Sequence, residues 1–183
     1  MATVVVPFRR ESAKLRLHPL PEEARAALAD AMLADVLAAA ETVGRTIVAS
    51  EANQGEAVEL ALRGVESGPI LVVNADLPCA QPRDLLALLG ALPDGGMALI
   101  EARDGTTNAV ALTAPHLFAP LYGPGSAGRF HARAERLDVP VVTAEIPNLV
   151  EDVDTLADLE RLEGRLGSHT AIALGEARAG LVP

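Results

Sequence analysis

The sequence of 183 residues predicts an α/β fold, a three-layer sandwich built around a mostly parallel sheet. Two observations lead to this prediction. Short apolar runs rich in Val, Ile and Leu alternate along the chain with longer Ala- and Leu-rich stretches, as successive strands and helices do. The apolar runs are also continuous, which is typical of strands that helices cover on both faces of a sheet.

The first half of the chain contains three expected strands and two expected helices. Residues 3–6 form an apolar run that Pro7 closes, so a buried strand is expected there. Proline and two acids at 21–23 are helix-start signals, and they open an expected helix over residues 21–43. The same alternation then predicts a strand at 46–49, a helix at 57–66 and a buried strand at 69–73.

The second half continues this alternation and ends in a segment without a clear period. A helix over 84–92 stops at Pro93, and strands at 97–102 and 109–112 flank a polar turn. The remaining expected elements are a helix at 126–137, a strand at 139–146 and a helix at 156–166. We therefore expect one domain over residues 1–166 and a loosely docked C-terminal tail over residues 167–183.

Composition excludes several classes of function. The net charge of −10 repels duplex nucleic acid, and aromatic residues make up only 2% of the chain, which leaves few rings for stacking bases. No run approaches the roughly 20 apolar residues of a membrane span. The single cysteine, Cys79, fits a reducing compartment. We expect a cytoplasmic protein with neither a nucleic-acid nor a membrane partner.

A basic loop follows the first expected strand. Residues 7–17 contain four cations, Arg9, Arg10, Lys14 and Arg16, although the chain as a whole is acidic. In sheets of this kind ligands bind beyond the carboxyl ends of the strands. Clustered Arg and Lys at such a position favour a polyphosphate ligand, while the simpler alternative is a solvated basic loop.

Two acidic motifs follow later in the chain. Asp76 comes directly after the buried strand 69–73, where its carboxylate suits Mg²⁺, although it could instead cap the turn ahead of Pro78. In the segment 151–159, a capping box opens the last long helix, with either Thr155 or Asp154 as its cap. We expect one of the alternate carboxylates, Asp152 and Asp154, to cap and the other to face a metal, and we assign the metal to Asp152.

A glycine loop at 122–129 matches the letters G-x-G-x-x-G but lies late in the chain, which argues against a dinucleotide site. Ser126 is the expected N-cap of the following helix, so the loop could present free amides to an anion. The alternative is a flexible loop ahead of a capped helix. The polar turn at 105–109 adds hydroxyl and amide groups, including those of Asn108, that suit a polar ligand.

Together these segments resemble the 2-phospho-L-lactate/phosphoenolpyruvate guanylyltransferase family, which acts in the biosynthesis of the deazaflavin coenzyme F(420). Their order and spacing agree with that family over residues 3–162. The matching segments are Val-Pro-Phe-Arg at 6–9 with Ala-Lys-Leu-Arg-Leu at 13–17, Asn-Ala-Asp-Leu-Pro at 74–78, Gly-Thr-Thr-Asn-Ala at 105–109, Tyr-Gly-Pro-Gly-Ser at 122–126, and Asp-Val-Asp-Thr at 152–155 with Asp-Leu at 158–159.

The resemblance implies a Rossmann-like nucleotidyltransferase fold of the glycosyltransferase-A type for residues 1–166. The implied reaction joins GMP from GTP to the phosphate of a small phosphorylated acid and releases pyrophosphate. The acid would be phosphoenolpyruvate or 2-phospho-L-lactate, here called the phosphoacid, and composition favours phosphoenolpyruvate. By matching positions, Asn108, Gly123 and Ser126 would bind the phosphoacid, and Asp76 and Asp152 would hold Mg²⁺.

The basic loop receives its role from the same resemblance. Arg9, Lys14 and Arg16 would bind the phosphates of GTP, and Lys14, Arg16 and Asp76 would act in catalysis. The sequence leaves a homodimer open.

Two alternatives remain. One is another nucleotidyltransferase of this fold, of the molybdenum-cofactor type, although the expected Leu-x-Gly-Gly phosphate loop is missing after the first strand. The other is a non-catalytic sensor or partner subunit that binds nucleotide. The shortened segment 50–56 leaves the sensor interpretation possible, and the presence of both Asp76 and Asp152 argues against that interpretation.

Overall fold

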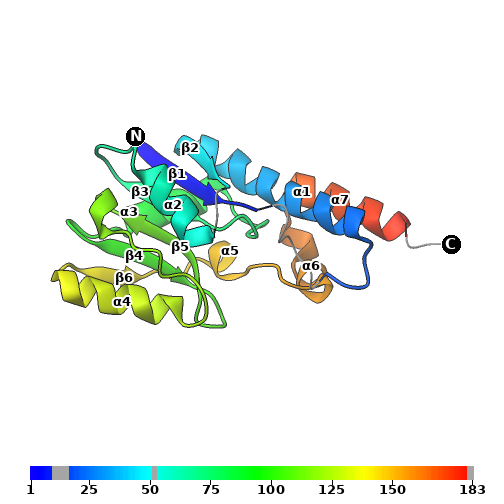
Figure 1. The fold of residues 1–183 in the computed structure, drawn as a ribbon. Coiled ribbons are helices and arrows are strands. Elements are labelled where there is room, and N and C mark those ends of the chain that lie inside the picture. Colours follow the sequence, from blue (N-terminus) through cyan, green and yellow to red (C-terminus); the bar gives the residue numbers. More distant parts are fainter. Residues whose placement is uncertain (10–16, 51–52, 181–183) are drawn as a thin grey trace.

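The structure is a computed structural model, and it describes residues 1–9, 17–50 and 53–180. A six-stranded sheet forms its centre, with strand order β2-β1-β3-β5-β4-β6 (Figure 1). The strands are β1 (Ala2–Pro7), β2 (Gly44–Ala49), β3 (Ile70–Val73), β4 (Met97–Glu101), β5 (Thr107–Leu112) and β6 (Val141–Thr143). β1 is parallel to β2 and β3, β4 is parallel to β6, and β5 is antiparallel to both of its neighbours.

Helices cover both faces of this sheet, which confirms the three-layer sandwich. On one face, α1 (Glu22–Glu41), α3 (Pro82–Gly90) and α5 (Pro147–Val150) pack against side chains such as Val4 and Val6 of β1. On the other face, α2 (Gln54–Leu62) and α4 (Ser126–Leu137) pack against Val5 and its neighbours. The central strands β1, β3, β5 and β4 are buried on both sides because successive side chains of one strand enter opposite cores.

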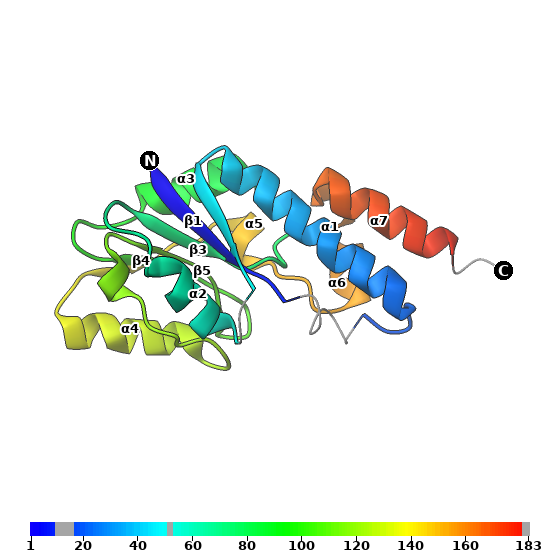
Figure 2. The same cartoon turned by 45° about the horizontal axis from the view of Figure 1, so that its top comes forward.

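A third apolar cluster lies outside this sandwich, where α1 extends beyond the sheet and meets α6 (Leu156–Leu162) and α7 (Ser168–Ala179) (Figure 2). The expectation of a loosely docked segment is wrong for α7, whose Thr170, Leu174 and Ala177 are buried. Asp35 of α1 also accepts hydrogen bonds from the N–H groups of His169 and Thr170, at 3.0 and 2.9 Å. Whether residues 1–166 form a separate domain stays a prediction.

Several boundaries differ from the expected ones. β6 covers only Val141–Thr143 of the expected strand 139–146, and a short helix that the sequence did not predict, α5, follows it ahead of the acidic segment. Two 3₁₀ turns, at Pro115–Leu117 and Glu163–Arg165, were not expected as separate elements. Among the described residues, none of the helices combines the length and apolar character that crossing a membrane requires.

Candidate active site

Asp76 lies in the loop that leaves the carboxyl end of β3, and Asn74 fixes the start of that loop. The Asn74 N–H donates to the carbonyl of Asn108 at 2.9 Å, and its side-chain amide donates to the carbonyl of Thr107 at 3.2 Å. The Asn74 side-chain oxygen accepts from Gln54 at the start of α2, at 2.7 Å. Asn74 thus ties together β3, β5 and α2, and it sets the position from which Asp76 projects.

A main-chain hydrogen bond joins this loop to the acidic segment near the C-terminus. The N–H of Val153 donates to the carbonyl of Asp76 at 3.0 Å, and the Val153 side chain is fully buried in the third apolar cluster. Side chains alternate along an extended chain, so the burial of Val153 turns Asp152 and Asp154 to the opposite side.

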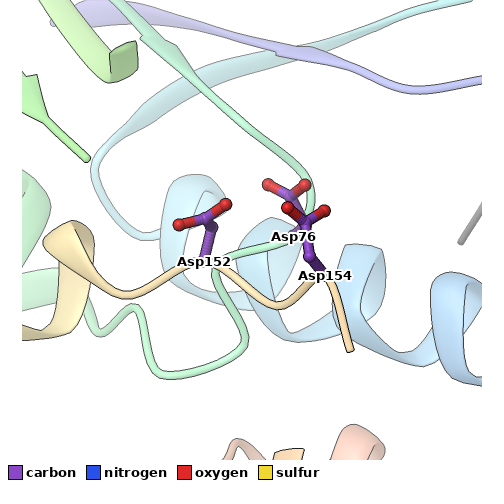
Figure 3. A group of neighbouring side chains, drawn as sticks. All are labelled: Asp76, Asp152 and Asp154. Carbon is purple, nitrogen blue, oxygen red and sulfur yellow. The ribbon is translucent and has the colours of Figure 1, made fainter. Parts of the chain in front are cut away.

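Three carboxylates therefore gather at one place (Figure 3). One carboxylate oxygen each from Asp76, Asp152 and Asp154 lies within 4.8 Å of the others, and all three residues are partly buried. The sequence paired Asp76 with Asp152, which the structure brings together, but left Asp154 out of the expected metal site. Two residues that are two positions apart in an extended segment share a side, and this was the overlooked signal for Asp154.

The cap of α6 is Thr155 and not Asp154. The Thr155 side chain accepts from the N–H of Asp158, and the Asp158 carboxylate accepts from the N–H of Thr155 at 2.8 Å. This reciprocal pair confirms the predicted capping box. Partial burial acts to raise the pKa of Asp158, but hydrogen bonds from Thr155 and Arg161 outweigh it and hold that pKa below its ordinary value.

Electrostatics in the cluster favour a cation. Burial raises the pKa of Asp152, the negative charges of Asp76 and Asp154 raise it further, and the nearby Asn108 amide offsets part of this effect. The cluster offers only carboxylate oxygens, the hard donors that divalent metals such as Mg²⁺ and Ca²⁺ prefer. Asp76, Asp152 and Asp154 could therefore hold a metal ion.

Glu151, which directly precedes Asp152, anchors the acidic segment. It is 8% exposed, and Arg103 donates to one of its carboxylate oxygens at 2.5 Å while Arg161 donates to the other. A further guanidinium, that of Arg165, lies 4.0 Å away. Arg103 belongs to the β4–β5 turn and Arg161 to α6, so the pairs connect the acidic segment to two separate elements.

Replacing Glu151 with Gln is expected to lower the free energy of unfolding by about 1–3 kcal/mol, because charged hydrogen bonds to two arginines are lost. For a chain of this length the thermal midpoint falls by about 2–4 °C per kcal/mol. Thermal unfolding of Glu151→Gln beside Glu160→Gln, an exposed position on α6, measures the difference. Equal midpoints for the two variants would contradict the anchoring role.

The polar turn and the glycine loop meet beside this cluster. Asn108 is 1% exposed, and its amide donates to the carbonyls of Leu149 and Val150 at 3.0 and 3.2 Å. Ser126 is fully buried, and its hydroxyl donates to that of Thr107 at 3.1 Å. The side chains of Asn108 and Ser126 thus make internal hydrogen bonds, and their direct contact with a ligand stays a prediction.

The cap of α4 differs from the expected one. Gly125 is the N-cap, with a φ of 69°, and Ser126 is the first helical residue. Glycine adopts the left-handed conformation readily, and with Gly125 in this conformation at the N-cap, Ser126 becomes the first helical residue. Gly123, with a φ of 105°, is exposed in the same loop.

The basic loop is described only in part. Arg9, two residues beyond the end of β1, is exposed, and Lys14 and Arg16 lie outside the described residues. The N–H of Phe8 donates to the carbonyl of Ala49 at 2.9 Å, which continues the β1–β2 ladder up to Arg9. The roles of Arg9, Lys14 and Arg16 stay predictions.

Solved structures share this fold. A nucleotide-diphospho-sugar transferase from Desulfovibrio desulfuricans superposes with a TM-score of 0.75 at 15% identity, over 97% of this chain and 95% of the other. A 2-C-methyl-D-erythritol 4-phosphate cytidylyltransferase from Thermus thermophilus gives 0.56 at 16% identity, over 96% of this chain and 98% of the other. No protein-family model matches the chain.

Sequence relatives are closer. A phosphoenolpyruvate guanylyltransferase from Nocardia farcinica is 34% identical over 91% of this chain and 87% of its own length. A 2-phospho-L-lactate guanylyltransferase from Halomicrobium mukohataei is 37% identical over 88% of this chain and 87% of its own. A third relative, the phosphoenolpyruvate guanylyltransferase of Sphaerobacter thermophilus, is 40% identical over 58% of this chain and 51% of its own.

The mixed sheet and its two helical layers define an α/β domain with the fold of the nucleotidyltransferases that superpose on it. Within this class, the extent of the sequence match decides the family. The chain belongs to the phosphoenolpyruvate/2-phospho-L-lactate guanylyltransferase family.

Proposed function

We propose that the protein is a guanylyltransferase of deazaflavin coenzyme F(420) biosynthesis that condenses GTP with phosphoenolpyruvate or 2-phospho-L-lactate. A phosphate oxygen of the phosphoacid bonds to the α-phosphorus of GTP, the bond from that phosphorus to the β-phosphate breaks, and pyrophosphate leaves. The convergence of Asp76, Asp152 and Asp154, in a chain of this family, is the observation that carries the proposal.

Mg²⁺ is the metal proposed for the three carboxylates. It prefers carboxylate and phosphate oxygens, and nucleotidyl transfer demands neutralisation of phosphate charge. When bound, Mg²⁺ would supply charge neutralisation and an anchor for the nucleotide's phosphate oxygens. Asp76, from the β3 loop, and Asp152 and Asp154, from the acidic segment, would hold it.

The remaining work assigned to the protein is positioning. A phosphate nucleophile is already ionised at neutral pH, so the reaction needs no general base. Arg9, Lys14 and Arg16 are proposed to bind the phosphates of GTP. The glycine loop, with Gly123 exposed and Ser126 at the start of α4, is proposed to bind the phosphate of the acceptor through main-chain amides.

Pyrophosphate release tests the proposal. The purified protein is incubated with Mg²⁺, one nucleoside triphosphate at a time, and either phosphoenolpyruvate or 2-phospho-L-lactate. Release with GTP only when a phosphoacid is present would support it. No release with any pair, despite saturable GTP binding, would instead indicate a non-catalytic nucleotide-binding protein.

Replacing Ser126 with Ala is expected to raise the KM for the phosphoacid about fivefold, since the lost hydrogen bond to Thr107 contributes ~1 kcal/mol. The KM for GTP should change less, because the hydroxyl helps to place the glycine loop and not the basic loop. Ser168→Ala is the matched control, because Ser168 is likewise the first residue of its helix, α7. A larger change in the KM for GTP than in that for the phosphoacid would mean that the glycine loop binds GTP and not the phosphoacid.

A further inference from the structure

One arginine donates hydrogen bonds to four consecutive main-chain carbonyl groups of the glycine loop. Arg129, on the second turn of α4, donates through Nε and Nη2 to the carbonyl of Leu121 at 3.1 and 2.8 Å. Nη2 also reaches the carbonyls of Tyr122 and Gly123, at 3.0 and 3.2 Å, and Nη1 donates to that of Pro124 at 2.5 Å. A single guanidinium therefore fixes the direction of four successive main-chain carbonyls.

The planarity of the peptide unit determines where the N–H groups of the glycine loop point once its carbonyls are fixed. In a planar trans peptide the N–H points opposite to the carbonyl of the same unit. The N–H groups of Tyr122, Gly123 and Gly125 share peptide units with three of these four carbonyls, so they point away from Arg129. Within the described parts of the chain, these three N–H groups have no hydrogen-bond acceptor, and outward amides of this kind suit an anion.

The glycines complete the arrangement. Gly123 and Gly125 have φ angles of 105° and 69°, which a side chain would strain. Their left-handed conformations let the loop curl around the guanidinium, and Arg129 satisfies the carbonyls that the curl turns inward. The loop and the arginine therefore act as one unit.

We propose that Arg129 is a positioning residue, which turns the amides of Tyr122, Gly123 and Gly125 towards the phosphate of the acceptor. The proposal rests on the proposed function in one respect, namely that this loop receives the phosphoacid. Five donors in a rigid, planar fork match several carbonyls at once, which the ammonium of lysine does not. The role of Arg129 is therefore geometric, and a retained positive charge does not replace it.

Arg133, one helical turn further along α4, offers a matched control. Its Nε donates to the carbonyl of Leu117 at 2.7 Å, and its Nη2 donates to those of His116 and Phe118, both at 2.9 Å. Arg133 thus uses the same chemistry on the 3₁₀ turn that precedes the glycine loop. A variant that loses the Arg133 guanidinium therefore measures how much such contacts stabilise the protein in general, without changing the contacts of the glycine loop.

The test compares Arg129→Lys, Arg129→Gln and Arg133→Lys. Both Arg129 variants are expected to raise the KM for phosphoenolpyruvate about tenfold, because small misplacements of binding groups have effects of this order. The KM for GTP and kcat should change less than twofold, and Arg133→Lys should resemble the wild type in all three. If only Arg129→Gln raised the KM for phosphoenolpyruvate, the charge and not the fork would be responsible, and the proposal would be overturned.

A second measurement needs no turnover. Order parameters of the Gly123 and Gly125 amides, from NMR relaxation of the free protein, should fall from about 0.85 to below about 0.6 in Arg129→Lys. They should stay unchanged in Arg133→Lys. Unchanged order in Arg129→Lys would overturn the positioning role even in an active enzyme, whereas failure of the wild type to release pyrophosphate would overturn the proposed function alone.

Discussion

Replacing Asp76 with Asn is expected to lower kcat by about a thousandfold or more while the protein still folds. Asp76 is the carboxylate that the β3 loop contributes to the cluster, and its own carbonyl holds the acidic segment through Val153. Asn preserves the size of the side chain and leaves the main-chain bond intact, but it removes the negative charge. Loss of about 4 kcal/mol of transition-state stabilisation, a reasonable share of a metal's contribution, corresponds to a factor of about 10³.

The measurement is pyrophosphate release at saturating GTP, phosphoenolpyruvate and Mg²⁺, together with thermal unfolding. Asp94→Asn is the control, since Asp94 is exposed in the turn after α3. Wild-type turnover in Asp76→Asn would remove Asp76 from the active site. A collapse of the thermal midpoint would show that the residue supports the fold instead.

Replacing Asp152 with Asn should have opposite effects on the metal-free protein and on metal binding. Burial and the neighbouring carboxylates raise the pKa of Asp152, so its ionised form is disfavoured in the folded protein. Removing this charge should raise the free energy of unfolding of the metal-free protein at neutral pH by about 1 kcal/mol. The stabilisation by Mg²⁺, about 2.7 kcal/mol for the wild type at a hundredfold excess over Kd, should largely disappear.

Thermal unfolding with EDTA and with Mg²⁺ measures both effects, and Asp94→Asn again serves as control. The pH dependence has a defined sign. Because the pKa of Asp152 is raised on folding, the wild type without metal should lose part of its stability as pH rises through that pKa, and Asp152→Asn should lack this loss. Equal stabilisation of wild type and variant by Mg²⁺ would exclude Asp152 as a ligand.

Local pattern predicted most of the fold, because the strands are continuous apolar runs and the long helices begin at recognisable signals. The resemblance to the family, and not local pattern, supplied the pairing of Asp76 with Asp152, whose carboxylates the structure brings together. The antiparallel direction of β5 follows from the short turn between β4 and β5, because a parallel connection would need a longer crossover.

The failures also have physical causes. In α7 the buried positions Thr170, Leu174 and Ala177 have helical spacing, but two of them are small or polar, while Ile172 on the same helix is 63% exposed. This distribution hid the apolar face of the helix. Asp154 was missed for a different reason: the segment is extended, so Asp154 shares a side with Asp152, and this spacing was available in the sequence.

The third apolar cluster links the acidic segment to the C-terminal helix. Val153, which lies between Asp152 and Asp154 in the chain, shares that cluster with Leu174 and Ala177 near the C-terminus. The acidic segment, which is proposed to bind a cation, thus packs against residues of the final helix. A substitution that loosens the packing of α7 should therefore also disturb the positions of Asp152 and Asp154 on either side of Val153.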